Sequence, residues 1–165
     1  MSKHLAKVFS LALIFALMLN LLPAQVQRAG AITTSIVISQ VYGGGGNTGA
    51  PYQQDYIVLY NPGTAAVDLS TWSVQYASSG GSTWTNKTNL SGTIQPGQYF
   101  LVAEAPGTSC INGTPCGSPL PTPDVTGTIF MSGSSGKVAL VYNQDLLACG
   151  SSCAGNIYVR DFVGF

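Results

Sequence analysis

The chain has 165 residues, of which 45% are hydrophobic and only 7% are charged. This length suits one domain with a real hydrophobic core, and the apolar content argues against intrinsic disorder. The single histidine, His4, lies at the extreme N-terminus. The rest of the chain therefore lacks the imidazole that a Ser-His-Asp or Cys-His catalytic arrangement needs, and it lacks histidine ligands for zinc.

The first 31 residues have the pattern of a cleavable signal peptide. Two lysines give them a basic start, and an apolar run over residues 8–22 predicts the signal-peptide helix. Because this run is shorter than the roughly 20 residues that cross a bilayer as a helix, an uncleaved membrane anchor is the weaker alternative. Ala29-Gly30-Ala31 predicts cleavage after Ala31. We therefore expect a secreted or cell-surface protein.

Cleavage at that point leaves a slightly acidic domain over residues 32–165. Three side chains in this range are cationic and six are acidic, which gives a net charge of −3. Nonspecific affinity for nucleic acid comes mainly from Lys and Arg side chains that neutralise phosphates. We therefore expect no nucleic-acid binding by this domain alone.

Residues 32–165 are typical of a single all-β domain. Short β-branched and aromatic runs alternate with clusters of Gly, Pro, Asn and Ser, and apolar residues show no sustained helical period. Asn61-Pro62-Gly63 and Gln95-Pro96-Gly97 predict tight turns, since Pro fixes φ at one corner and Gly accepts a positive φ at the next. The pattern predicts an antiparallel sandwich with strands at residues 36–42, 55–60, 72–76, 88–94, 99–103, 127–130, 137–142 and 157–164.

The apolar positions of these runs predict the hydrophobic core. The run from Val138 to Val141 is continuously apolar, which predicts a strand buried on both faces. Its inner face is expected to carry Val138 and Leu140, because these bring more apolar bulk than their neighbours. The predicted core residues are Ile36, Ile38, Ile57, Leu59, Leu69, Trp72, Val74, Leu101, Val138 and Leu140.

The four cysteines are Cys110, Cys116, Cys149 and Cys153. In an exported protein an even number of cysteines favours disulfides, and three pairings are open. Local pairing, Cys110 with Cys116 and Cys149 with Cys153, would pin two loops. A zinc site of four thiolates is the rival, but these spacings do not match the close pairs usual in such sites. We expect disulfides, with no metal and no other cofactor.

Two groups of side chains are candidates for binding or chemistry. Tyr52, Trp84 and Tyr142 lie near loops or strand edges, where an aromatic ring can stack on a sugar or simply pack on a partner. A glycosidase needs two carboxyl groups roughly 5 to 10 Å apart, and Asp55 and Glu104 are the available pair. The favoured interpretation gives Asp55 backbone hydrogen bonds at a loop-to-strand junction, with a ligand contact as an alternative. We expect no catalytic residue and no enzyme.

Four blocks of sequence, in order, resemble the lamin-tail domain family: IVISQVY at 36–42, DYIVLYNPG at 55–63, VDLSTWSVQ at 67–75 and GTIQPGQYFLV at 92–102. The resemblance implies an immunoglobulin-like antiparallel β-sandwich. It also implies a non-catalytic binding or tethering module, in bacteria often an accessory to a secreted nuclease or other hydrolase. A protein, cell-surface or carbohydrate partner is expected, and a carbohydrate-binding module is the alternative function.

The chain departs from the family at two positions and at its end. Gln40 and Val58 stand where members often carry acidic residues. Relatives usually continue beyond the position of Phe165. A chain truncated at its C-terminus, which lacks a downstream catalytic domain, is therefore a further expectation.

Overall fold

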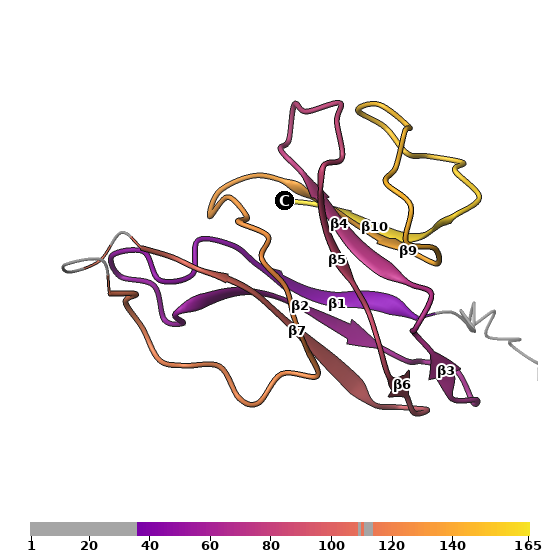
Figure 1. Cartoon of the computed structure of the whole chain (residues 1–165), viewed down its shortest axis with the longest axis horizontal. Coiled ribbons are helices and arrows are strands. Elements are labelled where there is room, and N and C mark those ends of the chain that lie inside the picture. Colours follow the sequence, from indigo (N-terminus) through magenta and orange to yellow (C-terminus); the bar gives the residue numbers. More distant parts are fainter. Residues whose placement is uncertain (1–35, 109, 111–113) are drawn as a thin grey trace, which may run out of the picture. The chain divides into compact units, whose positions relative to one another are not determined.

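The computed structural model describes residues 36–108, 110 and 114–165, and the predicted signal peptide and its cleavage site lie outside them. Within the described residues the regular elements are all β-strands (Figure 1). Across these same ranges, no helix is long and apolar enough to cross a membrane. The structure thus confirms the predicted all-β class.

The strands form two four-stranded sheets and one small ribbon (Figure 1). The first sheet has the order β1 (Val37–Tyr42), β2 (Gln54–Tyr60), β7 (Tyr99–Pro106) and β8 (Val125–Thr126). The second has the order β10 (Val159–Gly164), β9 (Lys137–Val141), β4 (Ser73–Ala77) and β5 (Asn86–Asn89). The ribbon pairs β3 (Val67–Asp68) with β6 (Thr93–Ile94). Neighbouring strands are antiparallel apart from β7 and β8.

Two predicted strands differ from the observed ones. The predicted strand 88–94 is split into β5 and β6, because the Leu90 amide turns to Trp72 O and Gly92 adopts a φ of 100°. The predicted strand 127–130 is irregular, and the only paired strand nearby is the short β8. The amide of Ile129 donates to a side-chain carboxylate rather than to a neighbouring strand, so the regular ladder ends there. The ribbon strand β3 was not predicted.

The main core lies between the two four-stranded sheets. It contains the predicted residues Ile36, Ile38, Ile57, Leu59, Leu69, Val74, Val138 and Leu140. Two predictions need correction. Trp72 is only partly buried against this core, and Leu101 lies on the opposite face of β7. Leu101 faces outward because successive side chains along a strand point to opposite faces of the sheet, and its neighbours Phe100 and Val102 face inward.

The second sheet is also buried on its outer face. Ala139 and Val141 of β9 pack there against Trp84, Leu147 and Cys153. These covering residues come from the loops 78–85 and 143–158, which lie together on one side of the sheet in Figure 1. The prediction that β9 is buried on both faces, with Val138 and Leu140 in the main core, is confirmed.

A buried lysine holds both covering loops in place. Lys137 Nζ donates to Gly81 O at 2.7 Å and to Ser151 O at 3.0 Å, and it lies 5.7 Å from the centre of the Trp84 ring. Trp84 Nε1 in turn donates to Gly150 O at 2.9 Å. These bonds satisfy buried polar groups that would be costly if left unpaired. The cover over this sheet is therefore a fixed part of the fold.

The cysteines form two local disulfides, Cys110–Cys116 and Cys149–Cys153. Their Cα atoms lie 5.3 and 5.1 Å apart, within the range that a disulfide spans. The favoured interpretation of the cysteines is confirmed, and the local pairing is the one observed. Two disulfides are typical of a protein from an oxidising, extracellular environment.

Candidate functional site

Asp55 is an internal anchor at the start of β2. Its side chain is buried and accepts hydrogen bonds from the amides of Gly45 at 2.7 Å and Met131 at 2.6 Å. Burial raises the pKa of this carboxyl, and hydrogen bonds from the backbone of Met131, Gly45 and Gly44 partly offset the rise. Asp55 therefore joins the glycine-rich loop at residues 43–46, between β1 and β2, and the segment after β8 to the first sheet. The backbone hydrogen bonds expected for Asp55 are observed. The alternative, a ligand contact, is corrected, because the residue is only 3% exposed.

Glu104 of β7 lies next to Asp55. The pairing of Tyr56 with Ala103 places the two carboxyls on neighbouring strands, and the charge of Asp55 acts on Glu104. Glu104 Oε2 accepts from Thr88 Oγ1 at 2.9 Å and from the amide of Ile129 at 3.0 Å. Its Oε1 is buried without a hydrogen-bond partner among the described residues. Burial, together with the nearby Asp55, raises the pKa of Glu104 to about 7.

This carboxyl pair lacks what a glycosidase needs. The structure brings Asp55 and Glu104 together, as the catalytic alternative required, but both are closed off inside the sandwich. Their oxygen atoms hold backbone amides and a threonine hydroxyl, so a substrate would have no room between them. Among the described residues no three His, Cys, Asp or Glu side chains are grouped so as to hold a metal ion.

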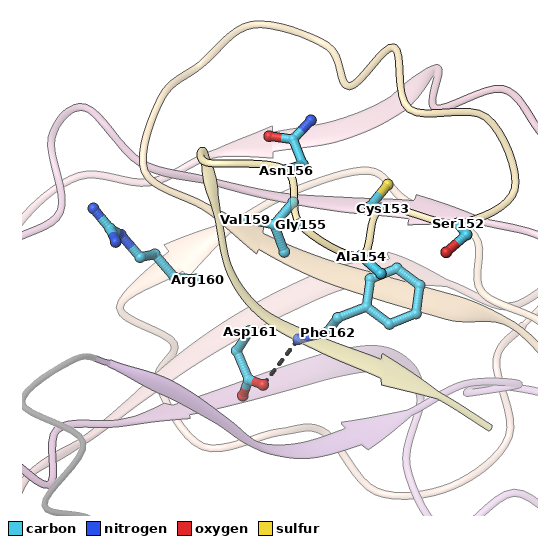
Figure 2. A pocket seen from close by; sticks show the side chains of 9 residues that line it. All are labelled: Ser152, Cys153, Ala154, Gly155, Asn156, Val159, Arg160, Asp161 and Phe162. Atoms are coloured by element: carbon cyan, nitrogen blue, oxygen red, sulfur yellow. Dashed lines mark hydrogen bonds between the residues drawn. The ribbon is translucent and has the colours of Figure 1, made fainter.

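A cavity of about 430 Å³ lies between the 152–156 loop and β10 (Figure 2). Its polar side chains do not converge on a ligand. Figure 2 shows Arg160, Asp161 and Phe162 pointing in three different directions. Arg160 lies over the ring of Tyr142 at 4.1 Å, and Asp161 accepts the amides of Ile38 at 2.7 Å and Phe162 at 2.8 Å. These side chains stabilise the fold around the cavity.

The outer face of the first sheet carries a different surface, rich in tyrosine. Since Ile57, Leu59 and Phe100 point into the core, their strand neighbours point outward. Tyr42 and Tyr56 are partners on β1 and β2 with ring centres 5.0 Å apart, and Tyr60 and Tyr99 are partners on β2 and β7 with ring centres 4.8 Å apart. Between these pairs lie Val58 and Leu101, also partners. We call this surface the tyrosine face: Tyr42, Tyr52, Tyr56, Val58, Tyr60, Tyr99 and Leu101.

A hollow of about 220 Å³ opens in the tyrosine face. Its floor is Val58 and Leu101 of the sheet. Tyr52 and Tyr56 form one part of its lining, and Leu120 and Pro121 from the segment before β8 form another. The lining is therefore aromatic and aliphatic, with phenol hydroxyls as its side-chain polar groups.

Tyr52 is positioned by contacts within its own loop, between β1 and β2, and with the loop between β7 and β8. Its ring edge meets Tyr42 and Tyr56, each at 5.7 Å between ring centres. The amide of Gly46 donates to Tyr52 O at 2.7 Å, and Gly46 O accepts the amide of Cys116 at 3.0 Å. Gly117 allows this close approach, because its φ is 93° and a Cβ there would lie 2.7 Å from Tyr52 N. The Cys110–Cys116 disulfide closes the same loop.

The tyrosine face carries none of the described cations, and one carboxylate lies at its edge, where Asp124 Oδ2 accepts the amide of Leu101 at 2.7 Å. The cations Lys87, Lys137 and Arg160 belong to β5, β9 and β10 of the other sheet. A tyrosine is already protonated at neutral pH, and burial raises the pKa of the Tyr56 phenol further. Gln40 and Val58, the two positions where an acidic residue was expected by resemblance, are partners across β1 and β2 on this face. Their neutral side chains leave the centre of the face without charge.

The structure separates the aromatic residues that the sequence singled out. Tyr52 joins the tyrosine face and is 36% exposed. Trp84 is only 2% exposed, which corrects the expectation of an available ring. Tyr142 is partly buried in another cluster, between Trp72 and Tyr158. The other tyrosines of the face were missed, although the alternation of outward and inward residues along β2 and β7 carries the signal for three of them.

The fold is an immunoglobulin-like β-sandwich whose two neighbouring carboxyl groups lie inside it. The sequence model described as Lamin Tail Domain matches residues 30–159, which is most of the chain. The chain belongs to the lamin tail domain family. No curated protein matches it.

Proposed function

We propose that this domain is a tethering module of an exported protein and that it binds its partner through the tyrosine face. The observation that carries the proposal is the difference between the two sheets. The outer face of the second sheet is covered by loops that Trp84 and Lys137 fix in place. The outer face of the first sheet leaves the rings of Tyr99 and Tyr52 64% and 36% exposed, although Tyr56 on the same face is buried. Aromatic residues are enriched in the buried centres of binding interfaces.

We further propose that any catalytic activity linked to this module is supplied by another domain or chain, such as a secreted nuclease or other hydrolase. The carboxyls of Asp55 and Glu104 support this, because they stabilise the interior and do not reach a surface where a substrate binds. The lamin tail domain match supports it too, as this is a non-enzymatic family. The paired-carboxylate hydrolase is the disfavoured alternative.

Export is tested first, on the full chain expressed in a bacterial host with its own N-terminus. We expect mature protein in the medium or on the cell surface, starting at Ile32, because Ala29-Gly30-Ala31 has the small residues that a signal peptidase recognises. Mass spectrometry of the intact protein measures the N-terminus. Full-length protein that stays inside the cell would contradict export.

Tethering is tested by joining a reporter enzyme to the C-terminus of the full chain. We expect cells or cell-wall material to retain the reporter, and to release most of it when Tyr52, Tyr60 and Tyr99 are all changed to Ser. The matched control is Tyr158→Ser, which removes a tyrosine of similar exposure (42%) outside the tyrosine face. Equal retention of the triple variant and the wild type would contradict binding through this face. A wild type released like the reporter alone would contradict tethering itself.

A further inference from the structure

We propose that the ligand of the tyrosine face is a neutral oligosaccharide, with one sugar ring seated in the hollow beside Tyr52. This inference rests on the proposed tethering function and names the chemistry of its partner. Four features of the face support it: its lack of cations, its mixed polarity, its dimensions and its rigidity.

The charge distribution disfavours anionic ligands. The domain's described cations lie on the strands of the second sheet, where Lys137 is buried and Arg160 is stacked on Tyr142. Acidic polysaccharides, nucleic acids and phosphorylated ligands are recognised through Lys and Arg, and the tyrosine face has neither. A neutral ligand leaves no buried charge unpaired on such a surface.

The lining matches a ligand that is apolar on one face and polar at its edges. The rings of Tyr52 and Tyr56 and the side chains of Val58 and Leu101 provide apolar contact area. Each tyrosine also carries a hydroxyl group that can donate or accept. The exposed amide side chain of Gln40 lies across from Val58 on the same face. A sugar ring has this character, with C–H groups on its face and hydroxyl groups around its rim.

The dimensions fit a chain of sugars better than a compact ligand. The hollow of about 220 Å³ is smaller than the roughly 300 to 1,000 Å³ typical of sites for drug-sized molecules, so it suits a single ring. The tyrosine pairs on either side of it are four residues apart along β2, from Tyr56 to Tyr60. At about 3.4 Å per residue they are separated by about 14 Å, which extends the surface beyond one ring.

The face is already organised for binding. Tyr42 and Tyr60 are fixed by strand pairing, and Tyr52 is held by the bonds that join Gly46 to Tyr52 and Cys116. A surface ordered in advance loses little conformational entropy when the ligand binds, which increases affinity.

The test applies the purified full chain to an array of neutral and acidic oligosaccharides. We expect binding to neutral oligosaccharides alone, unaffected by added salt because no charge pairs are involved. Tyr52→Ala and Tyr99→Ala should each weaken the binding by about tenfold or more, since each removes a stacking ring. Tyr158→Ala is the matched control and should bind like the wild type. Thermal melting of every variant confirms that it is folded.

Three results would overturn the inference. These are binding to no oligosaccharide, preference for acidic ones, and neutral binding that survives both substitutions in the face. A proline-rich peptide is tested in parallel, because aromatic-lined grooves also bind such segments and Pro121 already forms part of the lining. Binding of that peptide in place of any oligosaccharide would equally reject the sugar. Cell retention that still depends on the tyrosine face would then show that tethering stands and only its ligand was misassigned.

Discussion

Glu104 should make the stability of this domain fall as the pH rises from acidic to neutral. Its side chain is fully buried, and its pKa is raised from the usual 4.5 to about 7. Between pH 4.5 and pH 7 the folded protein keeps a proton on Glu104 that the unfolded chain has lost. The contribution of this proton to the free energy of unfolding is therefore fully present below about pH 4.5 and is lost as the pH rises through 7. A shift of this size corresponds to about 3 kcal/mol. The raised pKa of Asp55 acts in the same direction.

Glu104→Gln is the substitution that isolates this effect. The amide cannot ionise, and its oxygen can replace Oε2 as the acceptor for Thr88 and Ile129. Its NH₂ group then takes the place of Oε1, which has no partner, at a cost of roughly 1 to 3 kcal/mol. We therefore expect the variant to be less stable than the wild type at pH 5. The free energy of unfolding of the variant, measured relative to that of the wild type, should rise by up to about 3 kcal/mol between pH 5 and pH 8.

Urea unfolding followed by tryptophan fluorescence measures this difference, with the disulfides intact. The free energy of unfolding is determined for both proteins at pH 5 and pH 8. Asp145→Asn is the control, because this carboxyl is exposed, and its pH dependence should parallel that of the wild type. The reasoning fails if wild-type stability is constant or rises over this range, or if Glu104→Gln keeps the wild-type slope.

Three further predictions concern the cover over the second sheet. Trp84→Ala should destabilise the domain by about 3 to 5 kcal/mol in thermal or urea unfolding, while Tyr158→Ala should change it little. Lys137→Met should cost about 1 to 3 kcal/mol, because it leaves the carbonyls of both loops unpaired; a stability equal to the wild type would contradict this. Changing Cys149 and Cys153 to Ala should lower the free energy of unfolding by about 2 to 3 kcal/mol. Peptide mapping of the wild type should recover the two local disulfides.

Local features of the sequence determined the fold class and much of the core. Short apolar runs rich in β-branched residues, such as Ile57 to Leu59 and Val138 to Leu140, are typical of buried strands, and they predicted strand and core positions. The failures occurred where a partner far along the chain decided the structure. Residues 127–130 form no strand, because Glu104 takes the amide of Ile129, a contact across 25 positions.

In the candidate site, too, residue type could be predicted from the sequence, whereas burial and contacts depended on distant parts of the chain. The sequence identified the aromatic residues and the carboxyl pair, since both depend only on residue type. It could not tell that Trp84 turns inward over β9 while Tyr52 stays at the surface, because that depends on which loop folds over which sheet. Nor could it show that Asp55 and Glu104 meet inside the sandwich, since this needs the pairing of β2 with β7. Composition and alternation thus determined an all-β chain, and long-range strand pairing decided which side chains remained available to bind.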